Sequence, residues 1–127
     1  ALYSKNADVV FAVAGKTGLG VFEAAREQNK YAIGVDSDQK YIDPDHIICS
    51  MVKNIGESIY QVIGQYIADG TFAGGTIWEA DMSTGIISIG YGMEEEMPQQ
   101  VGDDVKAAVE ELSREIQNGL IVVDSTR

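Results

Sequence analysis

The chain has 127 residues, of which 45% are hydrophobic, so it is long enough to form one domain with a sizeable core. Lys and Arg number 9 against 20 Asp and Glu, which gives a formal net charge of -11 at pH 7. This acidic balance argues against sequence-independent binding to nucleic acid or to anionic membrane surfaces.

Short apolar strands alternate with amphipathic helices in the first part of the chain. Strands are predicted over residues 8–14, 31–35 and 47–52. A helix from Gly18 to Gln28 lies between the first two, with Leu19, Phe22, Ala24 and Ala25 on its inner side. Such alternation predicts an α/β fold with a parallel, doubly wound sheet.

A second helix is predicted from Asn54 to the stop at Gly70, and its apolar stripe is expected to belong to the core: Ile55, Ile59, Val62, Ile63, Tyr66 and Ile67. After residue 75 the pattern changes to extended runs around a turn at 83–85, an amphipathic helix over 101–117 and a last strand over 120–127. We therefore predict an α/β lobe over residues 1–75 and interlobe crossover strands, a helix and a terminal strand over 76–127. Residues from about Ile86 onward are expected to pack mostly against something other than that lobe.

The stretch "AVAGKTGLGVFEAA" resembles a phosphate loop at first sight. A P-loop needs a glycine at the position of Val10, and a β-branched residue in a strand cannot supply that geometry. A dinucleotide fingerprint starting at Gly18 would place its third glycine on Glu23. Asp36 does end the next strand at a suitable spacing, so a nicotinamide-dependent enzyme stays an alternative.

Other reactive side chains give little sign of chemistry. Cys49 is the single cysteine, and within "HIICSMV" it is expected to be a small buried hydrophobe. His46 has no second histidine or cysteine at metal-ligand spacing, and the run 94–96 lacks the ligand alternation of a calcium loop. No nucleophile or acid–base pair is evident, so we predict a protein that binds without turnover, with no metal and no cofactor.

The motifs "ADVVFAVAGKTGLGVFEAARE", "YAIGVDSDQ" and "CSMVKNIGESIY", in this order, resemble the carboxy-terminal half of the Bmp family of substrate-binding lipoproteins. The later "GTFAGGTIWEADMSTGIISIG" resembles the crossover segment of that family. The resemblance implies a fragment of a type I periplasmic-binding-protein fold, in which two lobes close on a ligand. It also implies the substrate-binding component of a bacterial ABC importer for a nucleoside, with a purine as the expected class.

The same resemblance implies the site residues. Gly15 corresponds to a glycine that lets the sugar approach the backbone, and Asp36 and Lys53 correspond to groups that bind the ribose hydroxyls. Each also has a structural explanation, as a turn glycine, an exposed carboxylate and a surface lysine. Lys16 is expected to point to solvent, and Trp78 to serve lobe packing or a hinge. The aromatic residue that stacks on the base and the groups that read its edge are expected upstream of Ala1.

Partners and location follow from the resemblance as well. ABC permease and ATPase subunits are the expected protein partners, and a lipid anchor upstream of this chain would hold the protein outside the cytoplasmic membrane of a bacterium. By itself the chain is expected to dimerise or exchange elements, because its apolar faces lack partners. A membrane-tethered nucleoside sensor of the same fold is an alternative to the importer, and the base preference stays open.

Overall fold

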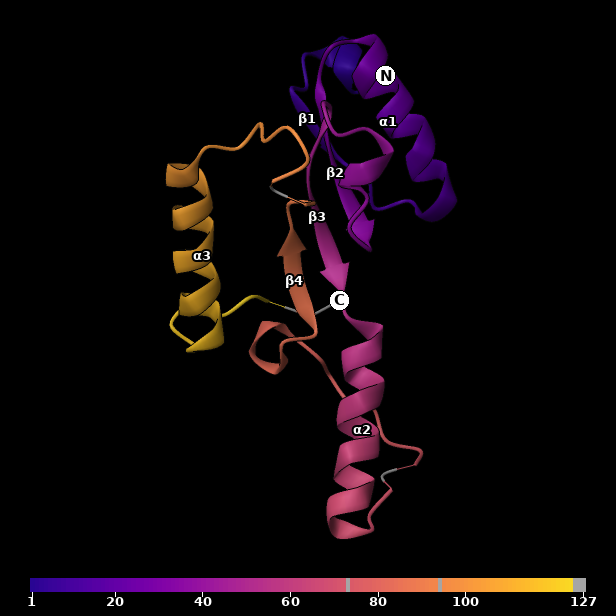
Figure 1. Ribbon diagram of the computed structural model, residues 1–127, viewed down its shortest axis with the longest axis vertical. Coiled ribbons are helices and arrows are strands. Elements are labelled where there is room, and N and C mark those ends of the chain that lie inside the picture. The colour runs from indigo at the N-terminus through magenta and orange to yellow at the C-terminus, as the bar shows by residue number, and fades with distance from the viewer. Residues whose placement is uncertain (73, 94, 125–127) are drawn as a thin grey trace.

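The computed structural model describes residues 1–72, 74–93 and 95–124 (Figure 1). Within these residues, four strands form one sheet in the order β1-β2-β3-β4. Their bounds are Val9–Phe11 for β1, Tyr31–Asp36 for β2, Ile47–Lys53 for β3 and Ile87–Gly90 for β4. Strands β1, β2 and β3 run parallel to one another, and β4 is antiparallel to β3. The predicted α/β class is confirmed.

The core lies between helix α1 (Gly18–Glu27) and the first strands, which Figure 1 shows beside each other. In β2 the buried Ala32 and Gly34 alternate with the less buried Tyr31 and Ile33, and α1 buries Phe22 and Ala25 on one face. The buried cluster consists of Tyr3, Ala12, Phe22, Ala25, Ala32 and Ile47. The Tyr3 hydroxyl also donates a hydrogen bond of 2.7 Å to the Tyr31 carbonyl, which fastens the amino-terminal turn to β2.

Two predictions in this region were wrong, one for the end of a strand and one for a side chain on α1. Strand β1 ends at Phe11 rather than at residue 14, because the chain turns into a short 3-10 helix, η2, over Gly15–Thr17. Leu19 is half exposed instead of facing the core, whereas Phe22 and Ala25 are buried as predicted.

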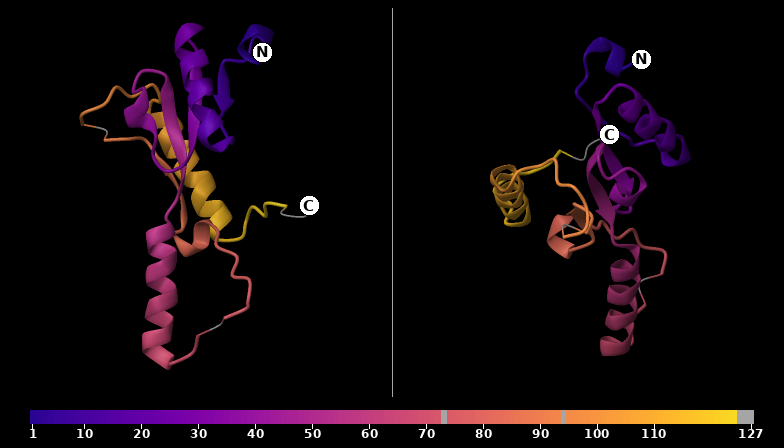
Figure 2. Two further views of the ribbon diagram at one scale, coloured as in Figure 1. Left: turned by 90° about the vertical axis from the view of Figure 1, so that its right-hand side faces the viewer. Right: turned by 45° about the horizontal axis from the view of Figure 1, so that its top comes forward.

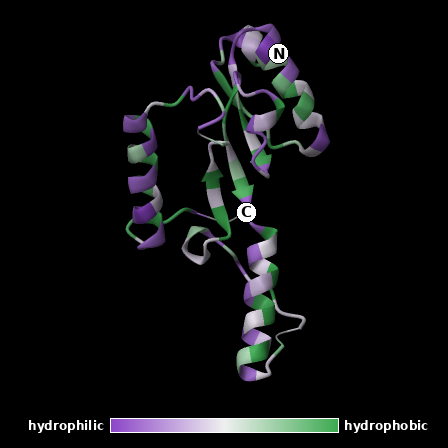
Figure 3. Ribbon diagram, in the orientation of Figure 1, coloured by the Kyte–Doolittle hydropathy of each residue, from purple (hydrophilic) through white to green (hydrophobic). Residues whose placement is uncertain are grey.

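Helix α2 (Ile55–Asp69) continues from the end of β3 and projects away from the sheet (Figures 1 and 2). Its stripe of Ile55, Ile59, Val62, Ile63, Tyr66 and Ile67 is 42% to 77% exposed. The expectation that this stripe lies in the core is wrong for this chain, because no other described element covers it. Figure 3 shows apolar residues recurring along this helix.

Strand β4 corrects the expectation that residues from about Ile86 onward pack mostly against something other than the first lobe. It pairs with β3 from Lys53 opposite Ile87 to Ser50 opposite Gly90, and Ile86 just before it is buried. Residues 86–90 therefore belong to the same sheet as the first lobe, because β3 offers a free edge that β4 covers. The predicted division of the chain near residue 75 stays a prediction.

Helix α3 (Asp103–Gln117) stands to one side of the sheet, away from α1 (Figures 1 and 2). It contacts the short helix η4 (Met82–Thr84), where the Gln117 amide donates a hydrogen bond of 3.2 Å to the Met82 carbonyl. Val105 and Leu112 are half exposed. Residues 120–124 are not in a strand, contrary to prediction, and residues 125–127 lie outside the described residues. In the described part of the chain, no helix is both long and apolar enough to span a bilayer.

Candidate ligand-binding site

The predicted site residues lie at the ends of three parallel strands. Asp36 is the last residue of β2, Lys53 is the last residue of β3, and Gly15 lies in the loop after β1. Parallel neighbours end at the same edge of a sheet, and that edge is where open α/β sheets bind ligands. The fold therefore brings these positions to one rim.

Asp36 and Lys53 form an ion pair, with Oδ1 and Nζ 2.8 Å apart. The strand register accounts for the contact, since Asp36 lies opposite Val52, the neighbour of Lys53. The two side chains are 60% and 46% exposed, respectively, so both charged groups are accessible to a ligand. An ion pair this exposed contributes only about 0–1 kcal/mol to folding.

The backbone of Asp36 has an unusual conformation. Its φ of 71° lies in the left-handed region, which aspartate tolerates better than most residues but which still costs free energy. The Ser37 amide donates to the Val35 carbonyl at 3.0 Å, and the Gln39 side chain accepts from the Val35 amide at 2.8 Å. These bonds hold the strained turn that directs the Asp36 carboxylate toward Lys53.

Gly15 has a φ of 53°, and a side chain added at this position would have no atom within 4 Å. Glycine is therefore favoured by the backbone conformation, and the space beside it is open. Lys16 is exposed, as expected. Among the described residues, no hydrogen bond or ion pair joins Gly15 to Asp36 or Lys53.

A polar network that was not predicted follows Asp36. Asp38 accepts from the Gly92 amide at 2.7 Å and from the Lys40 amide at 3.1 Å, and the fully buried Ser50 hydroxyl accepts from the Gln39 amide at 3.0 Å. Lys40 is 0% exposed, which is rare for lysine. Burial lowers the pKa of Lys40, and the nearby Asp38 carboxylate partly opposes this effect. No apolar periodicity in "DSDQKYIDPD" signals this burial.

His46 and Cys49 lie in a turn and in a strand, respectively, apart from any cluster of metal ligands in the described residues. The His46 ring lies 2.9 Å from the Asp43 carboxylate within a turn. Cys49 is half-buried in β3, and burial raises the pKa of its thiol. No group of three potential metal ligands occurs in the described part of the chain. Of the acidic run, Glu95 and Glu96 are exposed, and Glu94 lies outside the described residues.

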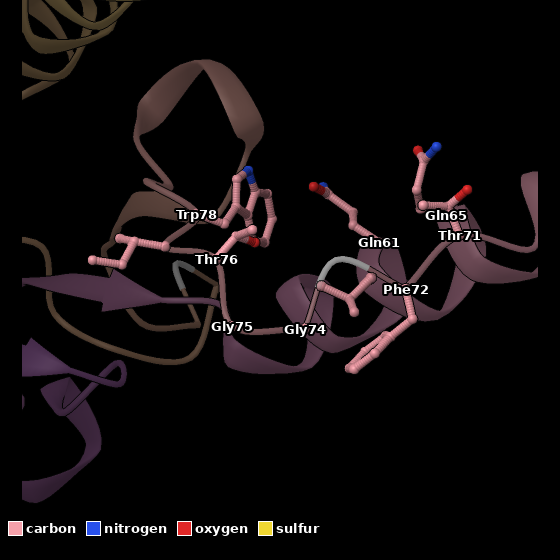
Figure 4. A pocket seen from close by; sticks show the side chains of 10 residues that line it. Gln61, Gln65, Thr71, Phe72, Gly74, Gly75, Thr76 and Trp78 are labelled. Atoms are coloured by element: carbon pink, nitrogen blue, oxygen red, sulfur yellow. The ribbon is translucent and has the colours of Figure 1, made fainter.

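A hollow beside α2 lies apart from this rim (Figure 4). Helix α2 contributes Gln61, Val62 and Gln65 to its wall, and the segment that follows contributes Phe72 and Trp78 among others. None of the three predicted site residues lines it. Trp78 lines this hollow and is 47% exposed, so its expected role in lobe packing or a hinge stays a prediction.

Comparison with known proteins places the chain in a family. A family model described as "Bmp: ABC transporter substrate-binding protein PnrA-like" matches residues 1–126. Basic membrane protein C of Borreliella burgdorferi is 43% identical over 83 residues, which are 64% of this chain and 24% of that protein. Basic membrane protein A of Borreliella afzelii is 30% identical over 124 residues, 96% of this chain and 37% of that protein. The chain thus spans about a quarter to somewhat over a third of the length of these relatives.

Solved structures support the fold. An ABC transporter solute-binding protein from Aeropyrum pernix matches with a TM-score of 0.75 at 24% identity, over 99% of this chain and 42% of the other. A protein from Bacillus halodurans, described as a transcriptional activator of the comK gene, matches with a TM-score of 0.73 at 25% identity, over 93% of this chain and 40% of the other. With the family model matching nearly every residue, the chain belongs to the Bmp family of PnrA-like ABC transporter substrate-binding proteins.

Proposed function

We propose that this chain forms one wall of the ligand cleft in a substrate-binding protein of a bacterial ABC importer, and that the ligand is a nucleoside, with a purine as the expected class. The observation that carries the proposal is the accessible Asp36–Lys53 ion pair at the ends of two adjacent parallel strands. The family to which the chain belongs supports the importer role.

The pair suits the vicinal diol of a ribose. Each hydroxyl can donate to the Asp36 carboxylate and accept from the Lys53 ammonium, and each charge-assisted hydrogen bond contributes about 1.5–3 kcal/mol when buried. The two groups already lie 2.8 Å apart, so one sugar edge can reach both. A sugar without these hydroxyls would leave Asp36 and Lys53 paired only with each other in a closed cleft, with their remaining hydrogen-bonding positions unfilled.

The loop after β1 favours a sugar over a phosphate. Open space beside Gly15 would let a sugar approach the backbone, whereas a phosphate loop would need a glycine at the position of Val10, which lies in β1. Residues outside this chain would read the base. Binding without turnover, permease and ATPase partners, and anchoring outside the cytoplasmic membrane complete the proposal.

A calorimetric panel on the full-length protein tests it. Purine nucleosides, pyrimidine nucleosides, free bases and ribose are titrated separately into ligand-free protein. We expect at least one nucleoside to bind more tightly than its base and more tightly than ribose. Binding of none of the nucleosides would contradict the proposal.

A sensor is a second candidate, since a protein from Bacillus halodurans described as a transcriptional activator shares the fold. A two-lobed binder can signal and deliver through the same closure. Deleting the permease genes separates the two roles: nucleoside uptake falls for an importer, whereas a sensor keeps its response.

A further inference from the structure

The buried Lys40 side chain joins two distant parts of the chain. Its ammonium donates hydrogen bonds to the Ile47 carbonyl at 2.7 Å, the Pro44 carbonyl at 3.1 Å and the Gln100 side-chain oxygen at 2.6 Å. An ammonium has three N–H donors, so these uncharged oxygens satisfy all of them. The Gln100 amide also donates to the Pro44 carbonyl at 3.0 Å, which closes the cluster.

Asp38 makes a second connection between the same parts. One of its carboxylate oxygens accepts from the Gly92 amide at 2.7 Å, and the other lies 3.5 Å from the Ser50 hydroxyl. The approach is close, because a side chain at Gly92 would come within 2.9 Å of the Lys40 stem, and one at Gly90 within 2.6 Å of Asp38. We call these contacts of Lys40 and Asp38 with Gln100 and Gly92 the Lys40 clasp.

The Lys40 clasp begins two residues after Asp36. Gln39 lies between Asp38 and Lys40, and its side-chain oxygen accepts a hydrogen bond of 2.8 Å from the amide of Val35, the residue before Asp36. The hydrogen bond between Gln39 and Val35 thus ties the strained turn at Asp36 to β2, and the Lys40 clasp ties the residues after the turn to the connection between β4 and α3. A turn in a left-handed conformation persists only where its surroundings hold it.

We propose that Lys40 is a positioning residue, which holds the connection between β4 and α3 against the loop after β2 and thereby keeps the Asp36 carboxylate in place for the ligand diol. The ligand in this inference is the nucleoside of the proposed function. The Lys40 clasp is independent of that function, because it is defined by the contacts of Lys40 and Asp38. Loss of the ammonium removes this donor from the Ile47 carbonyl and the Gln100 side-chain oxygen and leaves the Pro44 carbonyl with the Gln100 amide alone, so the loop and the connection separate and Asp36 loses its fixed direction.

The test compares the full-length wild type with Lys40→Met, which keeps the length of the side chain but removes its donors. Gln100→Leu is a milder variant that removes the Gln100 hydrogen bonds with Lys40 and with the Pro44 carbonyl but keeps the ammonium, and it remains informative if Lys40→Met does not fold. Lys5→Met, at an exposed lysine in the amino-terminal turn, is the matched control. Amide hydrogen exchange is followed in peptides covering residues 36–47 and 91–100, without any ligand.

The second measurement is the ratio of affinities for a ribonucleoside and its 2′,3′-dideoxy analogue. Destabilisation alone lowers both affinities and leaves the ratio unchanged, whereas a misplaced Asp36 lowers the ratio by about tenfold to a hundredfold. We expect Lys40→Met, and Gln100→Leu to a smaller extent, to speed exchange in both segments and to lower the ratio, with Lys5→Met like wild type.

Unchanged exchange in both segments of Lys40→Met would overturn the inference. If the wild type prefers the ribonucleoside over its 2′,3′-dideoxy analogue, faster exchange in the variant with an unchanged affinity ratio would overturn it too. If the wild type binds no nucleoside, the proposed function fails separately. The exchange arm then decides: faster exchange at residues 36–38 together with 91–100 supports the positioning role, and faster exchange confined to 91–100 refutes it.

Discussion

The Asp36 carboxylate lies 2.8 Å from the Lys53 ammonium, at the ends of two neighbouring parallel strands. Because both groups are about half exposed, their mutual attraction contributes little to stability, and a ligand can reach both. We therefore expect substitution of either residue to affect ligand binding more than stability.

Removing either charge should weaken nucleoside binding in the full-length protein. Asp36→Asn keeps a residue type that tolerates the left-handed backbone, and Lys53→Met keeps the length of the side chain. Each leaves the partner charge unpaired in a closed cleft, at a cost of about 2–5 kcal/mol, or roughly tens-fold to thousands-fold in affinity. Calorimetry measures the loss.

Lys16→Ala is the control for these variants, because Lys16 is an exposed lysine beside the same rim. It should bind like wild type. A phosphate-binding loop would give the reverse order, with Lys16 critical and nucleotides preferred over nucleosides.

Gly34 in β2 should not tolerate a side chain. A methyl group there would lie 2.5 Å from the hydroxyl of the buried Ser50 and 2.9 Å from the Gln39 side-chain oxygen. We expect Gly34→Ala to lower the free energy of unfolding by about 1–3 kcal/mol in urea denaturation. Gly20→Ala in α1, with nothing within 4 Å, should instead raise it by about 0.5–1 kcal/mol. Equal effects of the two changes would contradict the packing described for β2.

Cys49 should make stability fall at alkaline pH. Burial raises the pKa of its thiol above the ordinary value of 9.0, so the folded state resists deprotonation. This stability is fully present below the unfolded-state pKa and is lost as the pH rises from there through the folded-state pKa. Between about pH 7 and pH 10, wild type should lose more stability than Cys49→Ala, as measured by urea midpoints. The other titrating groups are common to both proteins, so parallel losses would show that the thiol is not buried.

The apolar stripe of α2 should make this 127-residue chain associate when it is produced by itself. Sedimentation velocity should show dimers or larger species at micromolar concentrations. Ile59→Lys with Ile63→Lys should shift the chain toward monomer, because two charges then interrupt the stripe. Gln65→Glu adds a charge at an exposed polar position of the same helix and should leave association unchanged. A monomeric wild type would show that the stripe drives no association.

The sequence predicted the elements whose cause is local. Apolar runs and helical periodicity located β2, β3 and the long helices, whereas Asp36 and Lys53 were proposed from the resemblance to the Bmp family and lie at the ends of β2 and β3. The stripe of α2 was recognised, but periodicity shows only that a face is apolar and not what covers it.

The burial of Lys40 and the pairing of β4 depend on residues far away in the sequence, so local patterns did not predict them. Lys40 lies in a polar stretch typical of a surface turn, and its burial depends on an oxygen of Gln100, 60 residues away. The antiparallel pairing of β4 likewise depends on the free edge of β3, which no local pattern of residues 87–90 reveals.

The central claim is that the Asp36–Lys53 pair recognises a ribose diol, and the most direct test is calorimetry of the full-length wild type with a ribonucleoside and its 2′,3′-dideoxy analogue. We expect the analogue to bind at least about tenfold more weakly, because it cannot make the hydrogen bonds that the diol adds to both charged groups. Equal affinity for the two ligands would contradict the account.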